Sequence, residues 1–596
     1  MPAVLEWATA ASLKPDADHN HLVSDLKEIV GKKHVLTNER ETRRYRTGIR
    51  FGTGKALAVV RPGSLVEQWR VLKACVEANV IVLSQASNTG LTGGSTPDGD
   101  NYDRDIVIVS TSRMKKIYLI DGGKQVVCLP GATLDQLEQE LRPIGREPHS
   151  VIGSSCIGAS VFGGICNNSG GALVQRGPAY TQMAVFARVD EGGNLRLVNH
   201  LGIRLDGSEE DALGRLDDGK FSDRDVLHDV GAGHDENYVR HVREIDEPTP
   251  ARFNADPNRL YEASGSAGKV MVFAIRLDTF PMERNAQVFY IGTNKTEELT
   301  DIRRQVLGKF KHLPISGEYL HRDAFEIAEQ YGKDTFLMIQ YFGTSRLPAL
   351  FGLKARCDAI FDRLPFLPSH LTDRFMQAVS HLFPRHLPAR MREFREKYEH
   401  HLLLKVSAEG AEEARAYLKR YFANAGGGSF FECTREEGEK AFLHRFAAAG
   451  AANRYRALHT RTVENILALD IALPRNERDW FEKLPAEIEE PIILKLYYGH
   501  FLCHVFHQDY IVKKGNDCME IEQKMWKLLD RRGAEYPAEH NVGHLYYAKP
   551  ALRDHYQSLD PCNCFNPGIG HTSKFAFYRE SENVESENTL PAAAVR

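Results

Sequence analysis

Two long loops rich in glycine, serine and asparagine constrain the fold of this chain more than any other feature of its sequence. The first, SQASNTGLTGGS at residues 84–95, follows the apolar segment 80–83, and the second, GSSCIGASVFGGICNNSGG, covers residues 153–171. Backbone amides gathered in such loops form a site for an anion, and small residues let a pyrophosphate approach the main chain closely. Neither loop has G-x-G-x-x-G spacing after a strand, and no G-x-x-x-x-G-K-[ST] motif occurs, which disfavours Rossmann and P-loop binding.

The segments around the first loop alternate between strand and helix. Residues 56–61 (ALAVVR) predict a buried strand, Ser64 and Glu67 form a capping-box pattern that opens a helix, and residues 80–83 predict a second strand. A strand, a helix and a strand within about 30 residues form a βαβ unit. Three further strands and one short helix are predicted at residues 105–110, 125–129, 270–275 and 133–141.

The composition excludes several classes of protein. The 596 residues are 42% apolar and 26% charged, as in ordinary globular proteins, and the length predicts several domains. A net charge of −4 disfavours a nucleic-acid binder. No stretch offers the roughly 18 apolar residues of a membrane-spanning helix, and the N-terminus lacks the basic region of a secretory signal. Ten cysteines without CxxC pairs fit a reduced, cytoplasmic compartment.

One segment departs from this overall acidity. Residues 363–397 carry seven basic and three acidic residues, a local charge of 7 − 3 = +4, interleaved with phenylalanine and leucine. One interpretation is a solvated charged face beneath a helical lid. A second is a peripheral docking site for an anionic membrane leaflet, where each cation contributes about 1 kcal/mol. A third, nucleic-acid binding, is disfavoured because the patch is interleaved with apolar residues and lacks a recognisable nucleic-acid-binding fold.

The glycine loops and their surroundings resemble a known family. The segments ALAVVRPGSLVEQWRVLKACVEANVIVLSQASNTGLTGGS, LPGATLDQLEQEL and SSCIGASVFGGICNNSGG are similar in order and spacing to the FAD-binding domain of the vanillyl-alcohol oxidase superfamily. The rest of the chain resembles the bacterial quinone-dependent (respiratory) D-lactate dehydrogenases, through passages such as KAFLHRFAAAGAA, VFHQDYIVKKG, YPAEHNVGHLY and NPGIG.

The resemblance implies an α+β fold with a two-subdomain FAD-binding domain, an α+β cap domain and a helical, Arg-rich membrane-contact insertion. The FAD-binding domain is expected at residues 1–278, completed by 531–596. The cap is expected at 279–321, 399–436 and 461–530, the membrane-binding insertion at 322–398, and a segment contacting both membrane and active site at 437–460.

The resemblance also implies the cofactor and its contacts. FAD is expected to bind non-covalently, because the first loop has no histidine or cysteine to link it, although Cys156 lies where some relatives carry such a link. The residues expected to cradle the pyrophosphate are Ala86, Ser87, Asn88, Thr89, Gly90, Gly94 and Ser95. Gly153, Ser160 and Gly170 are expected on the isoalloxazine and ribityl side, and Val272 at the adenine end or the diphosphate.

A histidine pair and a Glu-His pair form a second group of candidates. The resemblance implies that His500 and His507, with Glu539, ligate a divalent metal. The alternative is that the two histidines only hydrogen-bond within a crowded pocket. Strand alternation sends residues 500 and 507 to opposite faces, so that a shared site requires a helix, a bulge or a turn between them.

The resemblance further implies catalytic roles. Oxidation of a 2-hydroxy acid requires a base for the hydroxyl proton, and His540 is the candidate, with Glu539 holding its tautomer or ligating a metal. A substrate carboxylate requires a cation, for which Arg445 is the first candidate and Arg454 the second. His444 is a further candidate for the same pocket.

The expected activity is the oxidation of D-lactate to pyruvate, with electrons passed to a membrane quinone. The protein is expected on the cytoplasmic side of the inner membrane, with no nucleic-acid partner. Two alternatives remain open at this point: a flavin dehydrogenase or oxidase of another D-2-hydroxy acid, and a non-catalytic flavin-binding module that docks on membranes.

Overall fold

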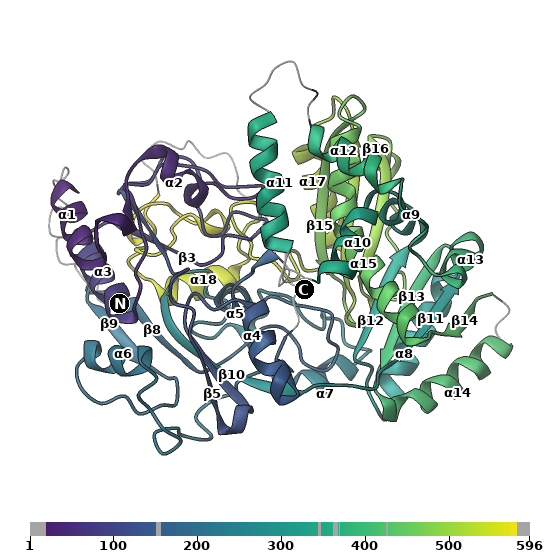
Figure 1. Cartoon of the computed structure of the whole chain (residues 1–596), viewed down its shortest axis with the longest axis horizontal. Coiled ribbons are helices and arrows are strands. Elements are labelled where there is room, and N and C mark those ends of the chain that lie inside the picture. The colour runs from purple at the N-terminus through teal and green to yellow at the C-terminus, as the bar shows by residue number, and fades with distance from the viewer. Residues whose placement is uncertain are drawn as a thin grey trace, which may run out of the picture.

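The computed structural model describes residues 19–580, apart from 151–156, 344–346, 362–367, 369 and 425–426. Of the residues singled out above, Gly153, Cys156 and Arg363 lie outside the described part of the chain. Three β-sheets follow one another along the sequence, and Figure 1 shows the first two on one side of the molecule and the third on the other. The mixture of helix and strand confirms the α+β prediction.

The first sheet contains the predicted βαβ unit. Its strand order is β1-β2-β4-β3, and β2, β4 and β3 run parallel. These strands are β1 (Val35–Leu36), β2 (Ala58–Val60), β3 (Ile81–Gln85) and β4 (Ile106–Ser110). Helix α3 (Leu65–Glu77) crosses between β2 and β3, and the Ser64 side chain caps it by accepting a hydrogen bond from the Glu67 amide. The glycine loop therefore begins at the carboxyl end of β3.

The second sheet has the order β5-β6-β10-β8-β9, and β7 pairs with β10. Its strands are β5 (Ile117–Ile120), β6 (Gln125–Cys128), β7 (Arg146–Pro148), β8 (Ala184–Val189), β9 (Leu195–Asn199) and β10 (Met271–Pro281). Helix α3 lies between the two sheets, and its Trp69 packs edge-on against Phe273 of β10 with ring centroids 6.1 Å apart. Helices α4 (Leu134–Leu141) and α5 (Val161–Cys166) pack against the other face.

The third sheet has seven strands in the order β14-β11-β13-β12-β16-β17-β15, and all their pairings are antiparallel. The strands are β11 (Gln287–Thr293), β12 (Ser316–His321), β13 (His400–Val406), β14 (Ser429–Glu432), β15 (Val463–Ala472), β16 (Ile492–His500) and β17 (Val505–Lys513). This sheet and its helices occupy the stretch that the sequence assigns to the cap.

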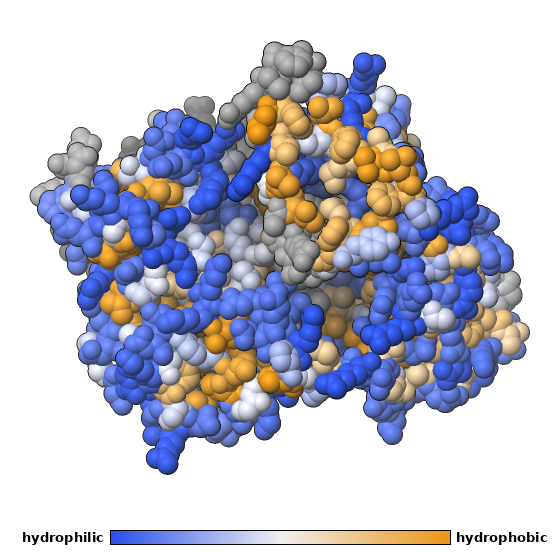
Figure 2. All heavy atoms as spheres, in the orientation of Figure 1, coloured by the Kyte–Doolittle hydropathy of each residue, from blue (hydrophilic) through white to orange (hydrophobic). Residues whose placement is uncertain are grey.

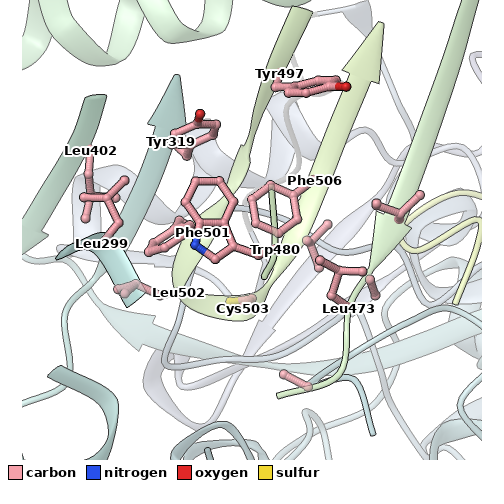
Figure 3. Packing of buried hydrophobic residues seen from close by; sticks show 14 of the residues in the cluster. Leu299, Tyr319, Leu402, Leu473, Trp480, Tyr497, Phe501, Leu502, Cys503 and Phe506 are labelled. Carbon is pink, nitrogen blue, oxygen red and sulfur yellow. The ribbon is translucent and has the colours of Figure 1, made fainter. Parts of the chain in front are cut away.

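Alternating side chains give the third sheet two buried faces. One face packs on α8 (Thr296–Lys309) and α14 (Ala408–Asn424), around a cluster with Trp480, Phe501 and Phe506 at its centre (Figure 3). The rings of Trp480 and Phe506 stack with centroids 5.5 Å apart. The opposite face packs on α9 (Arg322–Tyr331) and α15 (Arg435–Leu458).

The end of the chain returns to the first two sheets, as the yellow ribbon in Figure 1 shows. After α17 (Cys518–Arg531), which packs on β15, the chain continues through α18 (Pro550–Leu559). Phe565 forms a parallel bridge with Val82 of β3, and the Asn566 side chain donates to the carbonyl of Gly94. The remaining helices are α1 (His19–Val30), α2 (Glu39–Arg46), α6 (Glu209–Asp217), α7 (Tyr238–Arg243) and α16 (Ala486–Glu489).

The described part of residues 322–398 is mainly helical, as predicted. Beyond α9 they form α10 (Lys333–Phe342), α11 (Leu347–Phe361), α12 (Leu371–Ser380) and α13 (Ala389–Lys397). Figure 2 shows hydrophobic side chains gathered over α11 and α12. Among the described residues, every helix is too short or too polar to cross a bilayer.

Candidate active site

The register of the third sheet places five polar side chains on its α15-covered face. Glu318 of β12 lies opposite His500 of β16, and Tyr498 of β16 lies opposite His507 of β17. Asp470 of β15 lies opposite His507 in turn. Partners across an antiparallel ladder share a face, and so do residues two apart along a strand. All five therefore point to the same side.

A turn between two strands solves the spacing problem of the histidine pair. His500 ends β16 and His507 lies in β17, and the connection is a short 3-10 turn (Phe501–Cys503) followed by His504 in the left-handed region at φ 54°. Because the chain reverses between them, the two imidazoles reach the same face, with ring centroids 5.2 Å apart. Of the three arrangements compatible with the sequence, the structure has the turn.

Glu539 joins these histidines from the C-terminal segment. Its Oε2 lies 3.3 Å from Nε2 of His500 and 3.9 Å from Nε2 of His507. One ligand atom from each of the three residues lies within 4.8 Å of the others. Two imidazole nitrogens and a carboxylate oxygen are suitable ligands for a divalent first-row metal, so the residues fit such an ion.

The Nδ1 atoms of both histidines face other carboxylates. Nδ1 of His500 lies 2.7 Å from Oε1 of Glu318, and Nδ1 of His507 lies 3.3 Å from Oδ1 of Asp470. Burial lowers the pKa of His500, but Glu318 and Glu539 outweigh burial and raise this pKa to about 10. The two carboxylates that flank the His500 imidazole therefore favour its protonated form.

His540, the candidate base, is half-buried and held by Asp470. Its Nδ1 lies 2.6 Å from Oδ2 of Asp470, and the same oxygen accepts a hydrogen bond of 2.7 Å from the Glu539 amide. Burial disfavours the charged imidazolium, but the Asp470 carboxylate outweighs burial and raises the pKa of His540. With Nδ1 engaged, Nε2 is the nitrogen that can accept a proton.

Arg445 reaches this face from α15, whereas Arg454 does not. The Arg445 guanidinium lies 3.0 Å from Oε2 of Glu318 and 4.6 Å from the ring centre of Tyr498. Arg454 instead forms ion pairs with two aspartates of the helical insertion. His444 packs against Phe325 with ring centroids 4.3 Å apart, so the structure does not bring it to the site.

The first glycine loop borders a cleft between the two N-terminal sheets. The cleft has a volume of about 380 Å³ and is lined by Arg44, Tyr45, Gln85, Ala86, Ser87, Asn88, Ser110, Ser112, Lys115, Gly131, Thr133 and Gly158. In the described part of the chain, the amides of Ser87, Asn88 and Thr89 donate to no protein acceptor. Free amides beside Arg44 and Lys115 fit the anionic pyrophosphate of FAD.

The remaining described cofactor candidates make contacts within the protein. Ser160 caps α5 by accepting from the Gly163 amide, and the Ser95 hydroxyl donates to Asn88. Val272 lies in the buried strand β10, where its carbonyl accepts a hydrogen bond from Gln68. Their contacts with FAD, like those of Thr89, stay a prediction.

Two glycines show how closely the C-terminal segment approaches the loops. A Cβ added to Gly170 would lie 2.1 Å from Oε1 of Glu539, and one added to Gly94 would lie 2.8 Å from Nδ2 of Asn541. Gly90 has no atom near such a Cβ, which leaves room for a ligand. The histidine–carboxylate site therefore adjoins both glycine loops.

Three buried charged residues of the site were not found from the sequence. Glu318 and Asp470 support the histidines, and Arg252 is 2.7 Å from Oε1 of Glu539. None of them lies in a recognisable motif, and the strand register that brings the two acids to the histidines is a tertiary feature. The one signal in the sequence was weak: an acidic residue inside an otherwise apolar strand, as Asp470 is in ENILALDIA.

Solved structures place this arrangement in a class of proteins. The chain superposes on p-cresol methylhydroxylase with a TM-score of 0.57, at 12% identity, over 93% of this chain and 97% of that one. It superposes on alkyldihydroxyacetonephosphate synthase with a TM-score of 0.56, at 11% identity, over 95% and 89% of the two chains. A family model described as an FAD binding domain matches residues 56–196. The chain therefore shares the fold of these proteins, and its N-terminal part is an FAD-binding domain.

Curated relatives narrow this class to one family. The quinone-dependent D-lactate dehydrogenase of Haemophilus influenzae is 60% identical over 559 residues, which cover 94% of this chain and 99% of the relative. That of Escherichia coli is 60% identical over 565 residues, covering 95% and 99%. A family model described as D-lactate dehydrogenase, membrane binding, matches residues 288–578. The chain belongs to the quinone-dependent D-lactate dehydrogenase family, which confirms the resemblance seen in the sequence.

Proposed function

We propose that this chain oxidises D-lactate to pyruvate with bound FAD and passes the electrons to a membrane quinone. The observation that carries the proposal is the pairing of His540 with Asp470, 2.6 Å apart, in a segment that contacts both glycine loops. A base fixed beside a flavin cradle is what the oxidation of a hydroxy acid requires. The names of the relatives at 60% identity specify the substrate and the acceptor.

Each residue of the site has a part in this reaction. Bound FAD supplies the acceptor for the hydride that leaves the substrate carbon. His540 takes the hydroxyl proton on Nε2, and Asp470 stabilises the resulting imidazolium through Nδ1. Arg445 binds the substrate carboxylate, for which its forked guanidinium is well shaped.

His500, His507 and Glu539 would hold a divalent metal ion. Their ligand atoms converge, and each histidine keeps Nε2 for the ion because a carboxylate faces its Nδ1. Such an ion would supply positive charge that polarises the oxygen atoms of the substrate. The alternative, a hydrogen-bonded cluster without metal, predicts that the purified protein holds no stoichiometric metal.

The membrane surface is the third part of the proposal. Large apolar side chains are exposed on and beside α10–α12: Tyr341, Phe342, Leu353, Ile360, Phe375, Leu382 and Phe383. Among the described basic residues of 363–397, Arg390 forms an ion pair with Glu437 and Arg395 with Glu326, whereas Arg385 and Lys397 are exposed. We expect the apolar side chains to enter the cytoplasmic leaflet of the inner membrane and the exposed cations to contact its anionic headgroups.

Anaerobic reduction tests the proposed reaction. D-Lactate should bleach the yellow flavin of the wild-type protein, and His540→Ala should keep its FAD but bleach at least about 100-fold more slowly. His228→Ala, at an exposed histidine outside the site, serves as the control. Fast bleaching by His540→Ala would remove His540 from the role of base.

The same titration separates the alternatives. Faster bleaching by D-2-hydroxyglutarate than by D-lactate would favour another D-2-hydroxy acid as substrate. Peroxide release at the catalytic rate in air would indicate an oxidase. A flavin that none of D-lactate, L-lactate or D-2-hydroxyglutarate reduces would support the non-catalytic module.

A further inference from the structure

Two buried carboxylates lie behind the proposed active site, and each contacts two groups of it. Glu318 is 3% exposed and Asp470 is 6% exposed. Glu318 directs Oε1 to Nδ1 of His500 at 2.7 Å and Oε2 to the guanidinium of Arg445 at 3.0 Å. Asp470 directs Oδ1 to Nδ1 of His507 at 3.3 Å and Oδ2 to Nδ1 of His540 at 2.6 Å. The two acids thus have equivalent surroundings.

We propose that Glu318 and Asp470 are positioning residues that connect the metal ligands to the groups that handle substrate. Glu318 couples His500 to Arg445, and Asp470 couples His507 to His540. The inference rests on the proposed function, because it assigns the substrate-facing roles to Arg445 and His540.

The first half of the argument concerns the metal ligands. A neutral imidazole carries one proton, and a carboxylate at Nδ1 keeps that proton there and leaves the lone pair of Nε2 for an ion. Oδ1 of Asp470 is buried and accepts no hydrogen bond of regular geometry among the described residues, although Nδ1 of His507 lies 3.3 Å away.

The second half concerns the other oxygen of each acid. Oδ2 of Asp470 accepts from the Glu539 amide and from His540, so it fixes the main chain and the imidazole together. The Asp470 carbonyl also accepts from the Ala538 amide, which ties β15 to this segment at a third point. Oε2 of Glu318 holds the guanidinium of Arg445 over the Tyr498 ring. Asp470 therefore acts on the proton acceptor, and Glu318 acts on the carboxylate-binding cation.

This division predicts different kinetic defects in two otherwise similar variants. Asp470→Asn should lower the limiting rate of anaerobic flavin reduction by D-lactate about 100-fold or more, with little change in the half-saturating D-lactate concentration. Glu318→Gln should raise that concentration about tenfold or more, with a smaller change in the limiting rate. If the two acids were merely structural, one variant would not lose mainly the limiting rate while the other loses mainly D-lactate affinity.

Metal binding provides a readout that is independent of catalysis. Both variants should bind Zn²⁺, used as the probe ion in equilibrium dialysis of the FAD-loaded protein, about 10- to 100-fold more weakly than the wild type. Unchanged Zn²⁺ affinity in both variants would overturn the link to the histidines. The same loss of rate and of D-lactate affinity in both variants would overturn the division of roles.

Buried acids outside the site serve as matched controls. Glu482→Gln removes a buried glutamate paired with Arg532, and Asp235→Asn removes a buried aspartate paired with Arg259. Both should keep the wild-type kinetics and Zn²⁺ affinity.

If Asp470→Asn or Glu318→Gln loses its flavin, the test uses Asp470→Glu and Glu318→Asp, which move the carboxylate by one methylene at constant charge. The Asp470 variant should again lose limiting rate, and the Glu318 variant should again need a higher D-lactate concentration for half-saturation. A wild type that D-lactate does not bleach would instead contradict the proposed function.

Discussion

Two arginines of helix α15 carry the same charge but meet different surroundings. Arg454 forms ion pairs with Asp334 at 2.7 Å and Asp373 at 2.8 Å, so two carboxylates within the protein already balance its charge. Arg445 meets one carboxylate, that of Glu318, which also faces His500. Residue type and position on the helix do not distinguish Arg445 from Arg454, but their ion-pair partners do. Ion pairing therefore favours Arg445 as the substrate-binding cation.

Replacing Arg454 should damage stability rather than substrate binding. Arg454→Met leaves two buried aspartates without this partner, and breaking a buried ion pair costs about 3–5 kcal/mol. We expect a lower melting temperature, measured by flavin fluorescence, and an unchanged KM for D-lactate. A raised KM at unchanged stability would place Arg454 in the substrate site after all.

The two histidines and Glu539 became candidates because they lie in short motifs that resemble those of a known family. Their supporting residues lie far away in the chain: Glu318 is 182 residues from His500, and Asp470 is 70 residues from His540. Only the order and register of β12, β16, β17 and β15 bring them together. A single sequence carries no record of that register, so these partners could not be predicted.

At the scale of elements, the regular parts of the fold were predictable and the connections were not. Ser64 and Thr133 cap α3 and α4 as their patterns predict, because a cap depends on residues within one turn. The histidine pair shows the opposite case. Its spacing fits a helix, a bulge or a turn, and the hairpin β16–β17 is decided by pairing with β12 and β15 on either side.

Helices α10 to α12 allow a prediction about the membrane surface. Phe375 and Leu382 are 67% and 84% exposed, and transfer of each side chain into lipid is worth about 1.5–3 kcal/mol. The double variant Phe375→Asp, Leu382→Asp should therefore bind vesicles of phosphatidylethanolamine and phosphatidylglycerol at least about tenfold more weakly in a sedimentation assay.

The charge contribution is tested on the same vesicles. Arg385→Ala, at an exposed cation next to this apolar group, should weaken binding less than the double variant, and its effect should fade in high salt because salt screens exposed charges. A double variant that binds as the wild type does would show that these apolar side chains stay outside the membrane.

At the scale of the whole molecule, the C-terminal segment assembles the site from separate sheets. Ala538 and Glu539 bond to β15 of the third sheet, while Asn541 donates to Asn167 and its carbonyl accepts from Thr92, both in the glycine loops. The ligands of the proposed metal lie on the cap and on this segment. The cleft proposed for the pyrophosphate is lined by residues of the N-terminal part of the chain, from Arg44 to Gly158. The proposed metal ligands and this cleft therefore come from different segments of the chain.

This separation predicts that metal and flavin can be removed independently. Dialysis against a chelator should lower the rate of flavin reduction by D-lactate about 100-fold while the FAD absorbance stays with the protein, because none of the described residues of the two glycine loops is a proposed metal ligand. Added Zn²⁺ or Mn²⁺ should restore the rate, with metal content and flavin absorbance measured on the same sample. Release of FAD by the chelator would show that the two sites depend on each other. An unchanged rate after complete removal of metal would leave His500, His507 and Glu539 as a hydrogen-bonded cluster around the substrate.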